Sequence, residues 1–222
     1  DLTACAGAPY RIGREEDNLC QPMTLCFRMS GVDVDLAFKN TEKINALYRK
    51  FREDGKIKNP REDVLKFKYV ADGVLHLNST RIVKRSPFDL YDLSFAEREA
   101  RRQMFELYTF LKENCEGFEN STLLSSAPEI GVRESRMIDG VYTLTVTDLK
   151  DCVHFEDGIA ACNYDIDIHN PEGTGTSHYY FKEGTYYTIP YRSLMPKNIK
   201  NLLAAGRCIS GSHEAQASFR IM

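Results

Sequence analysis

Residues 94–111, SFAEREARRQMFELYTFL, contain the firmest helix signal in the chain. Ser94 and Glu97 have the spacing of a capping box, which satisfies amide donors at the first turn of a helix. Apolar residues then recur at helical spacing, at Ala100, Met104, Leu107 and Leu111. The sequence therefore predicts an amphipathic helix that begins at Ser94 and buries this stripe.

The arginines of this predicted helix lie largely off the stripe and alternate with glutamates. Such interleaving is typical of a solvated face that carries ion pairs, and it favours this interpretation over a binding patch. The residues concerned are Arg98, Arg101 and Arg102 with Glu97, Glu99 and Glu106.

Outside residues 94–111 the apolar pattern alternates between strand and helix periods. A second helix is predicted from Asn40 or Thr41 to Gly55, and another begins near Ser212. The predicted strands are residues 23–29, 64–70, 74–77, 81–84 and 141–146, with a hairpin over residues 179–189. This pattern indicates an α+β fold in which a mixed β-sheet has flanking helices.

The composition is that of an ordinary globular protein, with 222 residues, 42% hydrophobic residues and a formal net charge of −3. It excludes disordered and collagen-like classes, and it gives no electrostatic reason to expect a nucleic acid or a membrane as partner. No apolar run approaches the roughly 20 residues that span a bilayer. The seven cysteines are dispersed, which predicts reduced thiols and favours the cytoplasm. The oligomeric state stays open.

The first candidate site is residues 131–136, GVRESR. If these residues form a strand, Glu134 and Arg136 share one face and can pair, while Arg133 lies on the other face. One guanidinium is then free to bind a carboxylate or a phosphate. Surface ion pairing is the alternative.

The second candidate site is the alternating segment that contains Asp165, Asp167 and His169. On a strand these side chains share a face, but neighbours on one face stand almost 7 Å apart (about two strand rises), so we expect no metal. Residues 170–173, NPEG, end the strand. We therefore expect His169 at the mouth of a substrate pocket, as a proton-transfer group.

Two further segments offer binding groups. Tyr191 and Arg192 follow Pro190 and provide a ring and a guanidinium. Residues 202–211, LLAAGRCISG, indicate a short strand that leads into the helix near Ser212, an arrangement suited to an anion. No GxGxxG, P-loop, HExxH or GxSxG motif is present.

The order and spacing of four stretches resemble the FAD-dependent oxidoreductase family, in particular glutathione-reductase-like flavoproteins. The stretches are DLTACAGAPYRIGREEDNLCQPMTLCFRM (1–29), GVRESRMIDGVYTLTVTDL (131–149), YDIDIHNPEG (164–173) and YYTIPYRSLMPKNIKNLLAAGRCISGSHEAQASFRIM (186–222). One departure is Met137, where a second arginine is common in the family.

The resemblance implies a Rossmann-like FAD domain that is interrupted by a substrate or cap domain. By that reading residues 1–29 are a junction with the FAD domain, 30–195 are the inserted domain, and 196–222 are the returning strand and the start of a helix. The dinucleotide-binding segment would lie upstream. We therefore expect a fragment that is inactive by itself and does not retain FAD.

The chemistry implied by the resemblance is hydride transfer between a small organic substrate and the flavin. Gly206 and Arg207 would approach the flavin or its pyrophosphate, while Ser210, His213 and Glu214 would border the ring. The substrate side would be lined by Arg133, Arg136, His169, Tyr191 and Arg192. The arginines suggest a substrate with carboxylate or other oxyanion character. His169 is the first candidate base and His213 its rival.

An alternative from another class is a carbohydrate-binding module. The predicted hairpin at 179–189 carries Tyr179, Tyr180, Tyr186 and Tyr187, whose rings could stack on sugars. Aromatic residues in a hairpin more often pack across strands. This makes the enzyme the preferred interpretation.

Overall fold

The structure is a computed structural model that describes residues 2–221. The chain forms two compact units, one of residues 1–22, 133–172 and 176–222, and the other of residues 23–132 and 173–175. We call them unit 1 and unit 2. These units describe how the chain packs, with the chain leaving unit 1 after Pro22 and returning to it at Arg133. The expected division into a junction, an inserted domain and a returning segment, with boundaries at 29/30 and 195/196, stays a prediction.

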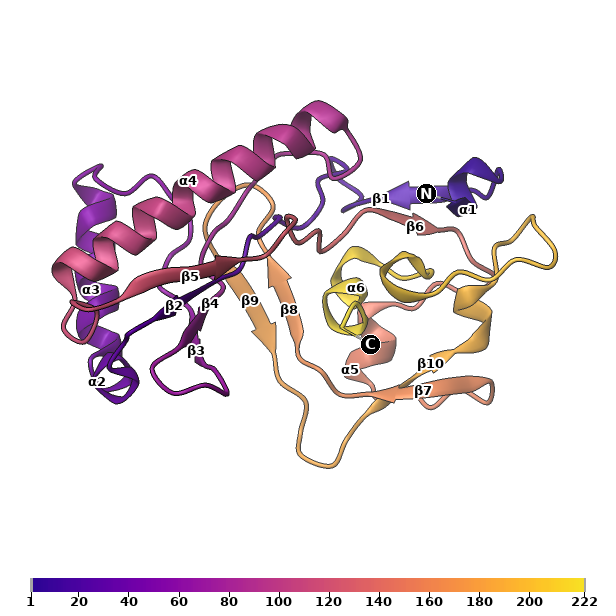
Figure 1. The fold of residues 1–222 in the computed structure, drawn as a ribbon. Helices are drawn as coiled ribbons and strands as arrows, with labels where there is room; N and C mark the ends of the chain where they lie inside the picture. Colours follow the sequence, from indigo (N-terminus) through magenta and orange to yellow (C-terminus); the bar gives the residue numbers. More distant parts are fainter. Residues whose placement is uncertain (1, 222) are drawn as a thin grey trace. The chain divides into compact units, whose positions relative to one another are not determined.

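Unit 2 is built on an antiparallel sheet with the strand order β3-β4-β2-β5. Its strands are β2 (Phe27–Ser30), β3 (Lys66–Lys68), β4 (Leu75–Leu77) and β5 (Thr122–Ser126), and its helices are α2 (Val34–Lys39), α3 (Thr41–Glu53) and α4 (Leu90–Asn114). Figure 1 shows α4 lying along one side of this sheet. The predicted hairpin around residues 71–73 is confirmed as β3 and β4.

The core of unit 2 lies between the sheet and the helices. Phe27 and Leu75 from the sheet pack in one cluster with Tyr48 of α3 and Leu107 of α4. The predicted apolar stripe of the long helix is confirmed, since its residues are all buried. Fully burying one such side chain stabilises the fold by roughly 1.5–3 kcal/mol.

The start of α4 differs from the prediction. The helix begins at Leu90, where Asp89 is the N-cap and its carboxylate accepts hydrogen bonds from the amides of Tyr91 and Asp92. Ser94 therefore lies inside the helix, because Asp89 offers an equally good cap one turn earlier. The predicted strand at 81–84 is also wrong, since it is reduced to a single bridge between Ile82 and Met23.

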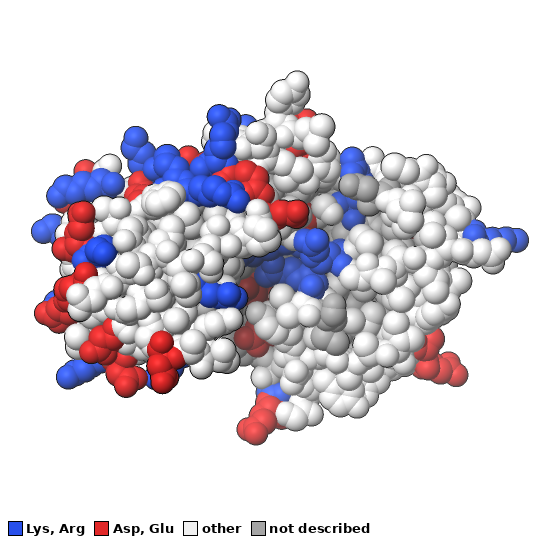
Figure 2. Space-filling view, viewed as in Figure 1, with Lys and Arg blue, Asp and Glu red and all other residues white. Residues whose placement is uncertain are grey.

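The outer face of α4 is solvated, as the alternation of charges predicts. Arg101 pairs with Glu97, while Arg102 pairs with Glu99 and Glu106. Figure 2 shows basic and acidic side chains interleaved over this helix. The binding-patch alternative finds no support in this pairing.

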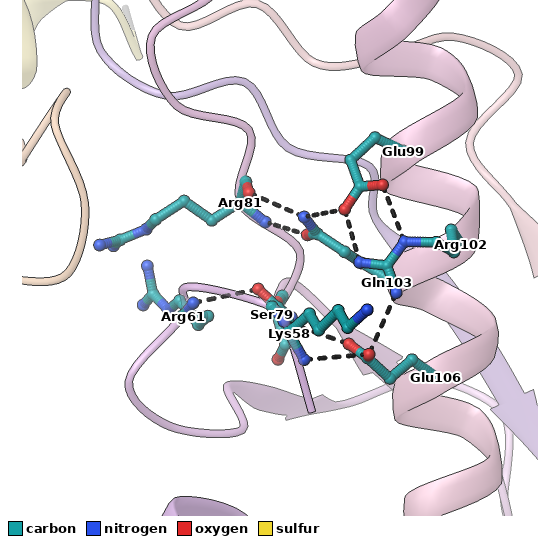
Figure 3. A network of polar contacts seen from close by, with 9 residues as sticks. Lys58, Arg61, Ser79, Arg81, Glu99, Arg102, Gln103 and Glu106 are labelled. Atoms are coloured by element: carbon teal, nitrogen blue, oxygen red, sulfur yellow. Dashed lines mark hydrogen bonds and ion pairs between the residues drawn. The ribbon is translucent and has the colours of Figure 1, made fainter. Parts of the chain in front are cut away.

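A buried polar network ties α4 to the loops before and after the β3–β4 hairpin (Figure 3). The Gln103 side chain accepts from the backbone amide of Arg81 at 2.8 Å and donates to its carbonyl at 3.1 Å. Glu106 accepts from the amides of Lys58 and Asn59. The Arg81 guanidinium is 1% exposed, and it donates to the carbonyls of Gly173 and Gly175 and pairs with Glu62.

Unit 1 contains small two-stranded antiparallel sheets and short helices. The sheets pair β1 (Tyr10–Ile12) with β6 (Arg136–Ile138), β7 (Gly158–Cys162) with β10 (Tyr187–Pro190), and β8 (Ile166–His169) with β9 (Thr176–Tyr179). The helices are α1 (Leu2–Cys5), α5 (Val146–Lys150) and α6 (His213–Phe219), with 3-10 turns η1 (Tyr191–Leu194) and η2 (Gly206–Cys208).

Helix α6 sits in the core of unit 1. Phe219 and Ala215 pack with Leu144, Tyr187 and Ile189. Gly211 is required just before this helix, because a Cβ there would lie 2.3 Å from the Phe219 ring. The mixed α+β class is confirmed, and no helix within residues 2–221 has the length and apolar composition that a membrane crossing requires.

Three predictions for unit 1 are corrected. Residues 141–146 form no strand, because Leu144 makes only a single bridge with Gly211 and α5 begins at Val146. Residues 179–189 do not form a hairpin, because β9 pairs with β8 and β10 pairs with β7. Residues 202–205 form no strand, although the helix near Ser212 is confirmed as α6, with Ser212 as its N-cap. Period-two alternation identifies a strand but not its partner, and four small or apolar residues do not specify a strand by themselves.

Candidate functional site

A buried polar cluster in unit 1 forms at the start of helix α6. His213 is the first residue of this helix, and its Nδ1 lies 2.9 Å from Oε1 and 2.8 Å from Oε2 of Glu134. Glu134 is 0% exposed and also accepts from the backbone amide of Gln21 at 2.8 Å. A carboxylate accepts hydrogen bonds only, so Nδ1 of His213 carries the hydrogen.

The partner of Glu134 corrects the sequence analysis. Only Arg136 of residues 131–136 lies in a strand, so the face that Glu134 and Arg136 were expected to share does not form. Glu134 precedes that strand and turns into the interior toward His213. A residue 79 positions away in the sequence supplies its partner, and no local pattern signals such a pair.

Two glutamines complete this cluster. The Gln21 side chain donates to Oε1 of Gln216 at 2.9 Å, and Gln216 donates to the carbonyl of Arg133 at 2.7 Å. Gln216 lies almost one turn after His213 on α6. Residues outside the helix hold both side chains: Gln21 and Arg133 hold Gln216, and Glu134 holds His213. Arg133 in turn donates to the carbonyl of Pro22. These bonds tie helix α6 to the backbone on either side of the cluster, at residues 21–22 and at Arg133 next to Glu134.

The Nε2 atom of His213 differs from Nδ1. It has no hydrogen-bond partner among the residues that the structure describes, and the residue is 7% exposed. With the hydrogen on Nδ1, the lone pair of a neutral imidazole is on Nε2. The pair therefore has the arrangement of a base that is oriented by a buried carboxylate.

His169 lies at the end of β8, as expected, but it is buried rather than exposed at a loop mouth. It is 4% exposed, its Nε2 lies 3.1 Å from Asp167, and its Nδ1 lies 3.3 Å from Oγ1 of Thr176. Strand β9 covers it, because Thr176 is directly opposite His169 in the β8–β9 pair. In the turn at 170–173 Pro171 is buried and only Glu172 is fully exposed, so the end of the strand does not bring His169 to the surface.

Burial, together with two nearby arginines, favours the neutral form of His169. Burial lowers the pKa of His169 to about 4; the hydrogen bond to Asp167 opposes this, and the charges of Arg133 and Arg220 add to the lowering. Burial raises the pKa of Asp167, but the bond from His169 and the charge of Arg220 outweigh it and bring that pKa to about 2. Both nitrogens of His169 thus have protein partners at neutral pH.

The predicted cofactor residues fall into two groups. Gly206 and Arg207 lie on the exposed turn η2, where Gly206 has a φ of +78° and open space on its Cβ side. Ser210 is buried, and its hydroxyl is engaged with the amide of Gly140 at 3.1 Å and with Thr143 at 3.0 Å. Glu214, on α6, is half-buried.

Arg207 and Arg220 contribute positive charge beside this cluster. Arg220 is paired with Asp167 at 3.4 Å, while Arg207 forms no ion pair with any other residue described in 2–221. Burial lowers the pKa of Arg220, Asp167 opposes that shift, and the charge of Arg207 contributes to the lowering. The two guanidinium groups therefore act on each other, and an anion would relieve their repulsion.

Three further residues were predicted to bind the substrate, and each of them contacts other residues of the protein. Arg192 is exposed and forms a two-pronged pair with Asp157, at 2.9 and 3.1 Å. Tyr191 is 41% exposed next to it. Arg136 lies over the ring of Tyr10. No contact in the described residues joins Tyr191 or Arg192 to His213 or His169.

The four tyrosines of the carbohydrate-binding alternative do not form one platform. Tyr187 is fully buried, and its hydroxyl is bonded to Ser218 at 2.9 Å. Tyr180 stacks on His178, and Tyr186 stacks on His154. Within residues 2–221 no group of three or more His, Cys, Asp or Glu side chains is arranged to hold a metal ion.

Comparison with known proteins gives one match. The family model described as FAD dependent oxidoreductase matches residues 1–222, which is the full length of the chain. No curated protein and no solved structure matches the chain.

Proposed function

The chain belongs to the FAD-dependent oxidoreductase family, and from this premise we propose that it provides the substrate side of a site for hydride transfer between a small organic substrate and flavin. The observation that carries the proposal is the buried Glu134–His213 pair, with Nε2 of His213 left without a protein partner. The glutathione-reductase-like subfamily, and a dinucleotide-binding segment outside this chain, belong to the same proposal.

The residues near η2 fit FAD in part. Gly206 and Arg207 are exposed and unobstructed, and an unpaired guanidinium suits an anionic group such as the pyrophosphate. Glu214 follows His213 on α6 and is half-buried. Ser210 does not fit a direct contact, because its hydroxyl is consumed inside the core. When FAD is bound there, it supplies the acceptor of the hydride.

His213 provides the proton chemistry of this proposal. A hydride leaves a carbon that bears a hydroxyl or an amine most easily when that group gives up its proton, since a C=O or C=N bond then forms. Nε2 of His213 accepts that proton. Glu134 stabilises the resulting imidazolium, and the bond from Nδ1 holds the ring in the required tautomer.

His169 supports the site rather than serving as its base. Its Nε2 hydrogen is directed at Asp167 and its Nδ1 accepts from Thr176, so neither nitrogen is available to a substrate without breaking a buried hydrogen bond. Asp167 in turn holds Arg220. We assign His169 to positioning of Arg220, through Asp167, and His213 to proton transfer.

The substrate in this proposal is small and carries a hydroxyl or amine next to an oxyanion. The exposed guanidinium of Arg207 suits one anion, either the oxyanion of the substrate or the pyrophosphate of FAD, while Arg192 and Arg220 are already paired with Asp157 and Asp167. Arg133 keeps a guanidinium nitrogen on Pro22 and so has a fixed position.

The experiment that tests the proposal is an anaerobic survey of the FAD-loaded enzyme with small hydroxy acids, amino acids and alcohols. The proposal predicts that the visible flavin absorption is bleached by at least one hydroxy or amino acid and is restored by an electron acceptor. A flavin absorption that no hydroxy acid, amino acid or alcohol bleaches would contradict the proposal, and binding of oligosaccharides by the same protein would support the carbohydrate-binding alternative.

A further inference from the structure

The face of the β3-β4-β2-β5 sheet that points away from the core carries a row of polar and aromatic residues. Phe67 is directly opposite His76, His76 is opposite Arg28, and Arg28 is opposite Ser125. Residues that face each other on antiparallel strands project from the same side of the sheet. The row therefore crosses all four strands, while Leu75 and Phe27 project into the core.

Arg28 is the unusual member of this row. Its guanidinium lies 4.3 Å from the centre of the Tyr69 ring, yet it forms no hydrogen bond or ion pair with the residues that the structure describes. Arg28 is half-buried, so part of its surface remains accessible to solvent. Stacking on Tyr69 fixes the plane of the guanidinium and leaves its fork of donors open.

A hollow lies beside Arg28, lined by Arg28, His76, Ser125, Ser126, Ala127 and Pro128 among others. The lining contains no carboxylate, and its polar groups include the guanidinium, the imidazole and two hydroxyls. The Ser126 hydroxyl donates to the carbonyl of Ala127. The Ser125 hydroxyl is not committed in this way and can donate into the hollow.

The electrostatics of the hollow are those of a single localised cation. Burial lowers the pKa of His76 and the charge of Arg28 lowers it further, so this imidazole is neutral at pH 7 and donates one N–H without adding charge. A guanidinium with a neutral donor and a hydroxyl beside it matches a planar or tetrahedral oxyanion.

We propose that this hollow on the outer face of the unit 2 sheet binds a small oxyanion, either a carboxylate or a phosphate group. Arg28 makes the principal contact through two guanidinium N–H groups, and His76 and Ser125 each donate one further bond. The proposal concerns residues 26–128 alone and stands independently of the flavin and of His213.

The test is an NMR titration of the 222-residue chain with sodium acetate and, separately, with inorganic phosphate, at constant ionic strength. We expect saturable shifts at the Arg28 Nε–H, the His76 ring and the Ser125 amide. Whichever anion saturates at the lower concentration identifies the chemical class. Shifts that stay linear and unsaturated for both anions would overturn the proposal.

Variants separate a specific site from general charge effects. Arg28→Gln should weaken binding at least about tenfold, since hydrogen bonds to charged groups are the stronger class. Arg98→Gln on the exposed face of α4 is the matched control and should leave binding unchanged. Arg28→Lys keeps the charge without the fork and should fall between the two.

Folding of the variants is checked by the same spectra. If Arg28→Gln does not fold, Ser125→Ala provides the second test and should weaken binding about threefold to tenfold, the range of one neutral hydrogen bond. Equal binding by the wild type and the Arg28 variants, or equal weakening by Arg98→Gln, would refute a site at Arg28.

Discussion

Glu134 offers the sharpest test of how the buried cluster is built, because its carboxylate is fully buried and serves two donors. Glu134→Leu removes both acceptors and fills the space with an apolar side chain. The amide of Gln21, 2.8 Å from the carboxylate, and Nδ1 of His213 would then lose their partner. Glu134→Gln keeps one acceptor oxygen at nearly the same shape, so only one of the two donors is stranded.

The expected cost follows from counting stranded groups. A buried donor left without a partner costs about 1–3 kcal/mol, so Glu134→Leu, which strands two donors, should lower the free energy of unfolding by about 2–6 kcal/mol. His213 can shift its hydrogen to Nε2 and relieve part of this cost, which places the expected value in the lower half of the range. Glu134→Gln should cost about half as much, roughly 1–2 kcal/mol.

The assay is urea unfolding at pH 7, followed by far-UV circular dichroism because the chain contains no tryptophan. Glu183→Leu, at an exposed position of the same unit, is the control and should change the unfolding free energy by no more than about 0.5 kcal/mol. The reasoning fails if Glu134→Leu is as stable as the control, or if Glu134→Gln costs as much as Glu134→Leu.

Three further predictions concern stability and cofactor content. Gln103→Leu strands the buried N–H and C=O of Arg81 and should cost about 2–5 kcal/mol in urea unfolding, whereas Phe105→Ala on the exposed side of the same helix should cost much less. His169 has a folded pKa of about 4 against 6.5 in the unfolded chain, so the unfolded state binds more protons between these values and stability should fall by about 3 kcal/mol as pH drops from 6.5 to 4. His169→Gln should remove this slope, and a wild-type curve that is flat over the same range would contradict the burial of a neutral imidazole. Residues 1–222 purified by themselves should carry no stoichiometric FAD, and a yellow preparation with one flavin per chain would show that these residues hold the pyrophosphate by themselves.

The local elements could be predicted because each depends on residues close in sequence. The spacing of Ile44 and Tyr48 places both on the buried face of α3, and Gly55 follows that helix with a φ of +70°. The turn triplet at 71–73 likewise specifies the β3–β4 hairpin. In these segments the periodicity and the stop signals predict the same structure, and the tertiary contacts stabilise that structure.

The long-range pairings could not be predicted in the same way. Alternation at residues 179–189 suggests two neighbouring strands, but each strand finds its partner earlier in the chain. The same limit applies to the site. His213 and Glu134 are each recognisable as polar residues in candidate motifs. Their contact could not be predicted, because the two residues are 79 positions apart in the sequence. His169 is buried because β9 pairs with β8 and covers it. The residues next to His169 in the sequence do not indicate this pairing.

In the proposed function, His213, oriented by Glu134, accepts the substrate proton during hydride transfer to flavin. The direct test is rapid-mixing measurement of flavin reduction in the FAD-loaded enzyme, with a substrate identified by bleaching, for the wild type, His213→Gln and His169→Gln. We expect His213→Gln to slow reduction about a hundredfold, the lower end of general base catalysis, with FAD content unchanged, and His169→Gln to slow it far less. Reduction of His213→Gln at the wild-type rate, or a hundredfold loss confined to His169→Gln, would contradict the account.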